Sequence, residues 1–235
     1  MKAIKRNLYT DVKSILATAK TNAAKAVNFA MVIAYWQIGK RIVEEEQGGS
    51  KRAAYGEKVL KDLSAQLTVD FGKGFSVQNL ENFRKFFILF PDNQKSYAVR
   101  RISEKENPNA LIGLRIELTW THYRHLLRVE NETARVYYMN EAAEQNWSTR
   151  TLERQINTLY FERLLSSKNK KPLIQKAKKD SDLDKPTILD FIKDPYILEF
   201  LELQPNATLY EKDLETELLI NSSNFYWNLI KGFHL

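Results

Sequence analysis

The chain is 235 residues long, with 43% hydrophobic and 11% aromatic residues, enough for one large packed domain or a medium domain with an appendage. It has no cysteine and only three histidines, which excludes disulfides and thiolate chemistry and leaves few ligands for a structural metal. The net charge of +7 favours a polyanionic partner, because cationic side chains that neutralise phosphates release counterions; charge that only keeps the protein soluble is the alternative.

The charge is divided unevenly along the chain. Residues 186–235 hold three basic and eight acidic side chains, whereas the preceding 185 residues hold 33 basic and 21 acidic ones. We therefore expect a basic body and a small acidic C-terminal part. No apolar run is long enough to cross a bilayer, and no apolar segment follows the basic N-terminus, so we expect a cytoplasmic protein with no membrane partner.

Helical periodicity predicts a long first helix from about Asn7 to Glu46. Its apolar stripe begins with Leu8, Val12, Ile15 and Leu16, passes through an alanine-rich middle and ends with Ile33, Ile38 and Ile42. The small residues of the middle are expected to let another helix pack closely.

Two further amphipathic helices, joined by a turn containing Gly72 and Gly74, are predicted between Tyr55 and Phe90. Ser76 is the expected N-cap of the second helix. The polar face of that helix and the turn carry the side chains that we expect to contact DNA: Lys73, Gln78, Asn82, Arg84 and Lys85. The pattern suits a helix-turn-helix unit, and an ordinary helical hairpin with a solvated face explains it equally well.

Residues 91–108 have little apolar periodicity and are predicted to form a loop. Arg100 and Arg101 make it either a phosphate-contacting wing or a mobile surface loop. A small β wing is expected between Tyr97 and Leu118.

Three more helices are predicted after this loop. The first is capped by Thr119, and the second turns Ala134, Tyr137, Tyr138 and Ala142 inward. The third runs without a break over residues 149–165, with Ser148 as its N-cap and Trp147 packing on Leu152. Its predicted buried side consists of Leu152, Ile156, Leu159, Tyr160 and Leu164, and its polar side adds Arg150 and Arg154 to the candidate DNA contacts.

These elements give a mainly α fold, a helix-turn-helix or winged-helix-like bundle over residues 1–165. Residues 166–186 are rich in lysine without a periodic apolar face, which predicts a linker. Residues 187–235 then form a separate short C-terminal part. His122 and His125 are three residues apart and could ligate a metal, but no third ligand is evident, so structural or surface roles are expected.

Five segments together resemble YhcG-type proteins, and the resemblance runs from about Leu8 to Phe233. They are YWQIGKRIV at 35–43, FGKGFS with Asn79-Leu80, LTWTHY with Leu126-Leu127-Arg128, NWSTR with LERQI, and KDPYILEFL at 193–201. The resemblance implies a bacterial protein with an N-terminal winged-helix-like DNA-binding domain and a C-terminal PD-(D/E)XK nuclease domain. In such a nuclease two acids hold Mg²⁺ and a lysine orients the attacking water.

The resemblance also implies that the catalytic strands would follow the helix with Asp213 and Glu215 and a glycine-containing segment, which Lys231-Gly232-Phe233 matches. The sequence given ends there, and its last 50 residues contain no acid-x-Lys triplet. Glu215 is thus at most an incomplete remnant, and we expect a nuclease domain cut short, with no catalytic residue, no metal site and no cofactor. Mg²⁺ is expected only if a partner supplies the missing core.

Three functional hypotheses follow. The first is the DNA-binding module of a YhcG-like nuclease, with DNA as its partner. The second is one subunit of a split PD-(D/E)XK endonuclease, completed by another chain, since the apolar residues Phe225 to Phe233 suit a partner surface. The third is a helical interaction or oligomerisation module that pairs with itself and binds no nucleic acid.

Overall fold

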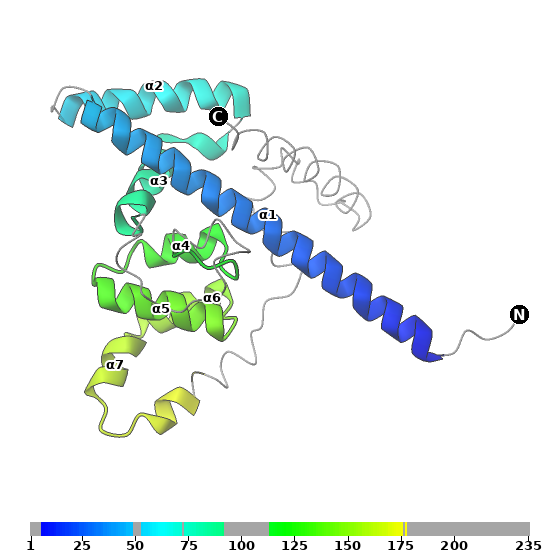
Figure 1. Cartoon of the computed structure of the whole chain (residues 1–235). Coiled ribbons are helices and arrows are strands. Elements are labelled where there is room, and N and C mark those ends of the chain that lie inside the picture. The colour runs from blue at the N-terminus through cyan, green and yellow to red at the C-terminus, as the bar shows by residue number, and fades with distance from the viewer. Residues whose placement is uncertain (1–5, 49–52, 72, 92–112, 176, 178–235) are drawn as a thin grey trace, which may run out of the picture.

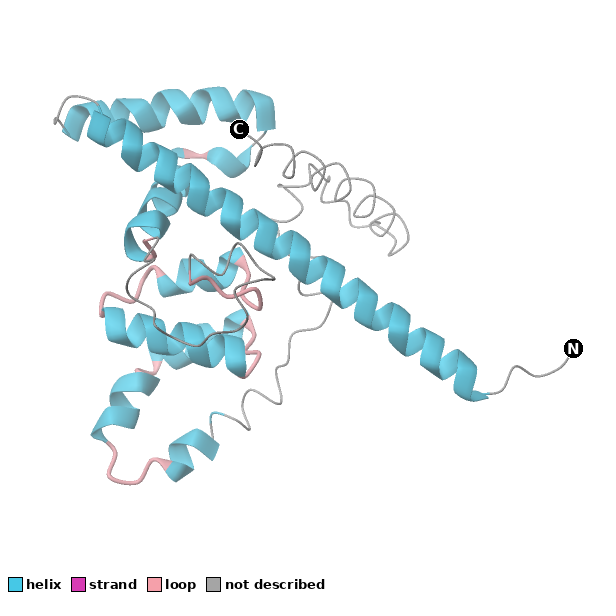
Figure 2. Ribbon diagram, viewed as in Figure 1, coloured by secondary structure: helices cyan, strands magenta, loops and turns pink. Residues whose placement is uncertain are grey.

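The computed structural model describes residues 6–48, 53–71, 73–91, 113–175 and 177. Within these residues the protein is mainly α, as predicted, and contains no strand (Figure 2). The elements in chain order are α1 (Arg6–Gly48), α2 (Ala53–Phe71), the 3₁₀-helix η1 (Lys73–Phe75), α3 (Val77–Leu89), α4 (Trp120–Leu126), α5 (Glu132–Glu144), α6 (Thr149–Asn157) and α7 (Tyr160–Ser166). Among the described helices, none has the length and apolarity required to cross a membrane.

The predicted first helix is confirmed as α1, which has 43 residues and a length of about 65 Å. Its C-terminal half packs against the other helices, and buried side chains begin at Ala24. The N-terminal half projects away from them (Figure 1). The predicted stripe of Leu8, Val12, Ile15 and Leu16 is therefore exposed instead of buried, because the described part of the chain places no helix beside it.

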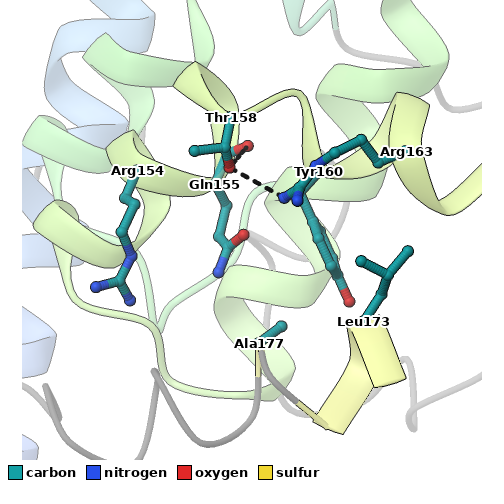
Figure 3. Close-up of a pocket in the computed structure, with 7 residues that line it drawn as sticks. All are labelled: Arg154, Gln155, Thr158, Tyr160, Arg163, Leu173 and Ala177. Atoms are coloured by element: carbon teal, nitrogen blue, oxygen red, sulfur yellow. Dashed lines mark hydrogen bonds between the residues drawn. The ribbon is translucent and has the colours of Figure 1, made fainter. Parts of the chain in front are cut away.

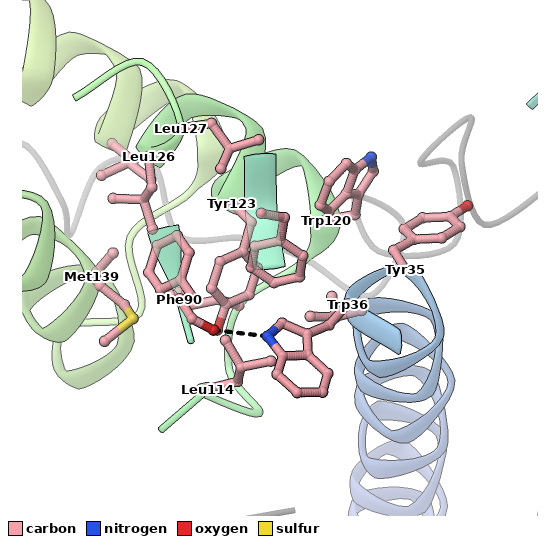
Figure 4. Packing of buried hydrophobic residues seen from close by; sticks show 14 of the residues in the cluster. Tyr35, Trp36, Phe90, Leu114, Trp120, Tyr123, Leu126, Leu127 and Met139 are labelled. Atoms are coloured by element: carbon pink, nitrogen blue, oxygen red, sulfur yellow. Dashed lines mark hydrogen bonds between the residues drawn. The ribbon is translucent and has the colours of Figure 1, made fainter. Parts of the chain in front are cut away.

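The core forms where α1 and α4 meet α3. Tyr35 of α1 stacks on Phe83 of α3 with ring centroids 4.2 Å apart, and Trp120 of α4 contacts the rings of Tyr35 and Phe83. Trp36 Nε1 donates a hydrogen bond to the carbonyl of Phe90 at 2.7 Å, which fixes the end of α3 to α1 (Figure 4). Burial of these large rings is the main stabilising contribution of this core.

The two helices predicted between Tyr55 and Phe90 are confirmed as α2 and α3, but they pack less against each other than α3 packs against α1. The expected N-cap Ser76 accepts a hydrogen bond from the amide of Asn79. α3 contacts α1 far more extensively than it contacts α2. Phe86 is fully buried, together with Leu80 and Phe83 of the same helix.

The bundle of α4 to α7 follows the predicted helices with one exception. Thr119 and Ser148 cap α4 and α6 as expected, and Trp147 and Leu152 are both buried in the core. The predicted continuous third helix is wrong, because the chain breaks between α6 and α7 at Leu159, which adopts φ 51° and ψ 48°. Leu159 is consequently exposed, whereas the prediction buried it.

The hydroxyl of Tyr138 explains how the break is tolerated. This oxygen accepts a hydrogen bond from the amide of Phe161 at 3.0 Å and donates to the carbonyl of Gln155 at 3.3 Å. It thereby satisfies backbone groups that an interrupted helix leaves without helical partners. The break also turns Tyr160 into the core.

The predicted wing and linker are described only in part. Residues 113–118 form turns, with the amide of Arg115 donating to the hydroxyl of Tyr123 at 2.8 Å, and contain no strand. Residues 92–112, and with them most of the expected β wing, lie outside the described residues. Of the linker, residues 171–175 are helical and Ala177 is buried, while residues 178–235 also lie outside.

Candidate nucleic-acid interface

Two hydrogen bonds between side chain and backbone join the N-terminus of α3 to the turn before it. Besides the Ser76 cap, the amide nitrogen Nδ2 of Asn79 donates to the carbonyl of Gly74 at 2.8 Å. Both contacts fix the direction in which α3 leaves the turn. Lys73 belongs to η1, and its side chain lies outside the described part.

The outer face of α3 forms an exposed polar ridge, which we define as Gln78, Glu81 and Lys85. Asn82 lies beside this ridge and is half-buried. The structure therefore brings together three predicted contacts, Gln78, Asn82 and Lys85, on one side of a helix whose opposite side is core. Glu81 adds an acid that sequence reasoning had left out, although its spacing from Gln78 and Lys85 could have revealed it.

Arg84 points away from the ridge. Its Nε donates to the Glu46 carboxylate of α1 at 2.7 Å, and the Glu46 side chain is only 18% exposed. This pair joins α3 to α1 at the end of α1 where the helices converge. Arg84 thus links α3 to a residue 38 positions upstream in the chain, and because its side chain is 43% exposed its expected contact with DNA stays a prediction.

Arg150 and Arg154 lie on α6, apart from the ridge of α3. Both side chains are exposed. α6 packs mainly against α4 and α7, and α4 in turn contacts α3 through the aromatic core. The predicted contacts therefore form two sets on separate elements.

A small cavity of about 120 Å³ opens between α6, α7 and residues 171–177 (Figure 3). Its lining consists of Arg154, Gln155, Thr158, Tyr160, Arg163, Leu173 and Ala177. Nη2 of Arg163 donates to the hydroxyl of Thr158 at 3.2 Å, which holds one guanidinium at the rim. The Arg163 guanidinium beside the Thr158 hydroxyl, with Arg154 also in the lining, suits a phosphate oxygen.

Sequence reasoning missed this cavity and the place of Arg163 in it. The cavity exists because the chain breaks at Leu159, and a continuous helix would have separated its lining residues differently. The pair Asn157-Thr158, both weak helix formers, was the one local sign of a helix end.

The two histidines of α4 have structural roles. Nδ1 of the buried His122 accepts from the amide of Thr119 at 3.2 Å, and its Nε2 donates to the carbonyl of Trp147 at 2.9 Å. Burial lowers the pKa of His122 to about 4, so the ring is neutral near pH 7. His125 lies 3.7 Å from Glu153, and burial lowers its pKa as well. No group of three or more metal-ligating side chains occurs among the described residues.

Arg100 and Arg101 lie outside the described residues, so their expected role stays a prediction. The described part thus supplies one ridge on α3 and one arginine-lined cavity beside α6, and both helices contact α4.

Comparison with known proteins relates the chain to one family. A family model described as the DUF1016 N-terminal domain matches residues 11–163. The chain is also 33% identical, over 242 aligned positions, to a curated protein of Escherichia coli (strain K12) named "Putative nuclease YhcG". That alignment covers 97% of this chain and 64% of the relative, so the chain spans just under two thirds of the relative's length. No solved structure matches the chain significantly.

Proposed function

Because this chain belongs to the YhcG-like family with the DUF1016 N-terminal domain, we propose that its helical region binds duplex DNA. The relative is named as a nuclease, and a nuclease acts on nucleic acid. The net charge of +7 supports the same class of partner.

One observation carries the proposal: α3 presents a polar ridge while its opposite side is anchored in an aromatic core. A groove-binding helix needs this combination, because side chains that read base edges must be held in a fixed orientation. The Trp36–Phe90 hydrogen bond, the Tyr35–Phe83 stack and the Arg84–Glu46 pair supply the anchor.

In the proposal α3 enters the major groove with its ridge toward the bases. The amides of Gln78 and Asn82 match the donor and acceptor pattern of adenine, and the carboxylate of Glu81 matches the amino group of cytosine. Lys85 contacts a phosphate, and its charge adds affinity without sequence information. Arg150 and Arg154, together with Lys73, Arg100 and Arg101, are proposed as further phosphate contacts.

The proposal assigns DNA binding to this region and leaves cleavage outside it. Binding should therefore need no divalent metal, since phosphate contacts by lysine and arginine are purely electrostatic.

Fluorescence anisotropy of a labelled duplex, measured in EDTA over a series of salt concentrations, tests the proposal. The logarithm of the association constant should fall linearly with the logarithm of the salt concentration. Lys85→Ala should weaken binding and reduce the magnitude of that slope by about one, because one phosphate contact is lost. Gln78→Ala should weaken binding to some sequences and leave the slope unchanged.

Lys61→Ala is the matched control, since Lys61 is an exposed lysine on α2 and does not belong to the ridge of α3. It makes the same change in net charge and should alter binding much less than Lys85→Ala. Equal effects of the two substitutions would show that the ridge has no special role. Absence of salt-dependent DNA binding by the unmodified protein would rule the proposal out.

A further inference from the structure

The N-terminal part of α1 exposes an apolar surface that the rest of the described chain leaves uncovered. Every side chain from Leu8 to Ala19 is exposed, and the first buried one is Ala24. Figure 1 shows this end of α1 projecting from the other labelled helices. The large apolar members are Leu8 at 59%, Tyr9 at 67%, Val12 at 45%, Ile15 at 66% and Leu16 at 56% exposure. We call residues 8–19 the arm. The arm continues a helix whose later turns are packed, but it receives no tertiary packing from the described chain, and packing supplies most of the stability of helices in proteins.

The spacing of the arm residues is that of a coiled-coil seam. Leu8, Val12, Ile15 and Ala19 follow one another at intervals of four, three and four residues, as the a and d positions of heptads do. Tyr9 and Leu16 flank this seam on one side and widen the apolar surface. Lys13 and Ser14 lie off the seam, so the seam itself carries no charge.

The area of the arm matches the requirement of a self-associating surface. Its five large apolar side chains expose on the order of 500 Å² per chain, so two copies could bury up to roughly 1,000 Å², the lower limit for a specific interface. A seam without charged residues packs best against a helix that presents apolar side chains at the same spacing. The arm of a second copy of the chain is such a helix.

We propose that two copies of this chain associate through their arms as an antiparallel pair. In this arrangement Val12 of one copy faces Ile15 of the other, and Leu8 faces the small Ala19, so that large and small side chains alternate. The folded body of each copy begins near Ala24 and lies beyond the opposite end of the overlap. A parallel pair would instead place both bodies at the same end and Leu8 against Leu8.

Sedimentation velocity of the full chain, without DNA, tests the pairing. The expected result is a particle of twice the chain mass at about 10 µM, a typical range for a small apolar interface. Ile15→Lys places a charge in the seam and should weaken association at least tenfold. Ser14→Lys adds the same charge one position away, off the seam, and should leave the dimer intact.

Two outcomes would overturn the pairing: a monomer for the unmodified chain even at about 100 µM, or an Ile15→Lys variant that dimerises as tightly as Ser14→Lys. A monomer would mean that another part of the chain, or a different protein, covers the arm. Circular dichroism of both variants checks that the helical body is retained.

The absence of cysteine allows the antiparallel register to be tested directly. A disulfide forms only between side chains with Cα atoms closer than about 7 Å. An oxidised mixture of Val12→Cys and Ile15→Cys chains, one of them carrying a mass tag, should give mainly the mixed disulfide. If each variant instead cross-links preferentially to itself, the antiparallel arrangement is incorrect. Both tests are made without DNA, so their outcome is separate from that of the DNA-binding proposal.

Discussion

His122 connects two helices through both nitrogens of its ring. The ring accepts from the Thr119 amide at the start of α4 and donates to the Trp147 carbonyl just before α6. The bond from the Thr119 amide is incompatible with a doubly protonated ring, since it needs Nδ1 as an acceptor, whereas the Nε2 donor to Trp147 is kept in either state. The sequence placed this histidine in a helix, but its partner 25 positions away could not be read from spacing.

The pKa of His122 predicts a pH dependence of stability. The ring takes up a proton near pH 6.5 in the unfolded chain but only near pH 4 in the folded one. The unfolded state therefore binds more protons between these values, and the free energy of unfolding should fall by about 3 kcal/mol as pH drops through this window. Above about pH 6.5 this contribution is complete and constant.

Urea unfolding at about pH 7 and about pH 5 should show about 2 kcal/mol of this loss, because pH 5 lies inside the window. His122→Gln should lower stability at about pH 7 and remove most of the pH dependence of the free energy of unfolding. His125→Gln serves as the control and should leave most of that pH dependence in place. A pH dependence that survives in the His122 variant would assign the effect to other groups.

At the scale of elements, the approach of α1 to α3 depends on one glycine. A Cβ atom built on Gly39 would lie 2.0 Å from the Phe83 carbonyl oxygen and 2.7 Å from its carbon. These are backbone atoms of α3, so they cannot move aside without shifting the helix. Gly39→Ala should therefore cost about 1–3 kcal/mol of stability, or more, as overpacking of a close contact does.

Gly56→Ala is the matched comparison for urea or thermal unfolding. A Cβ at Gly56 would lie 3.0 Å from Glu46 Oε1, a side-chain atom that needs to give by only a few tenths of an ångström while Oε2 keeps its bond to Arg84. Alanine also favours a helix over glycine by about 1 kcal/mol, so this change should be close to neutral. Similar losses for both substitutions would mean that the α1–α3 contact is looser than described.

The sequence predicted the positions of the helices better than the contacts between them. Periodicity and the caps Ser76, Thr119 and Ser148 located α3, α4 and α6, because these signals are local. The break at Leu159 depends on the Tyr138 hydroxyl of a neighbouring helix, and the direction of Arg84 depends on Glu46. Both are long-range contacts, which is why the ridge was predicted in part and the cavity was missed.

At the scale of the molecule, the arm and the body should be energetically separable. The arm side chains are exposed, so the described core gains little from them. Deleting residues 1–20 should leave cooperative unfolding of the body, with a free energy of unfolding changed by less than about 1 kcal/mol in dilute solution. Loss of cooperative unfolding in urea would show that the arm supports the core.

If the arms pair and α3 binds DNA as proposed, the continuity of α1 determines how far apart two half-sites lie. From the midpoint between Val12 and Ile15 to Gly39, where α3 is anchored, α1 rises by about 38 Å. Two chains related by a dyad at that midpoint would hold their anchored α3 helices about 75 Å apart, slightly more than two turns of B-DNA. The preferred sites should then be inverted repeats, with half-sites on one side of the duplex at a spacing set by the rod that joins them.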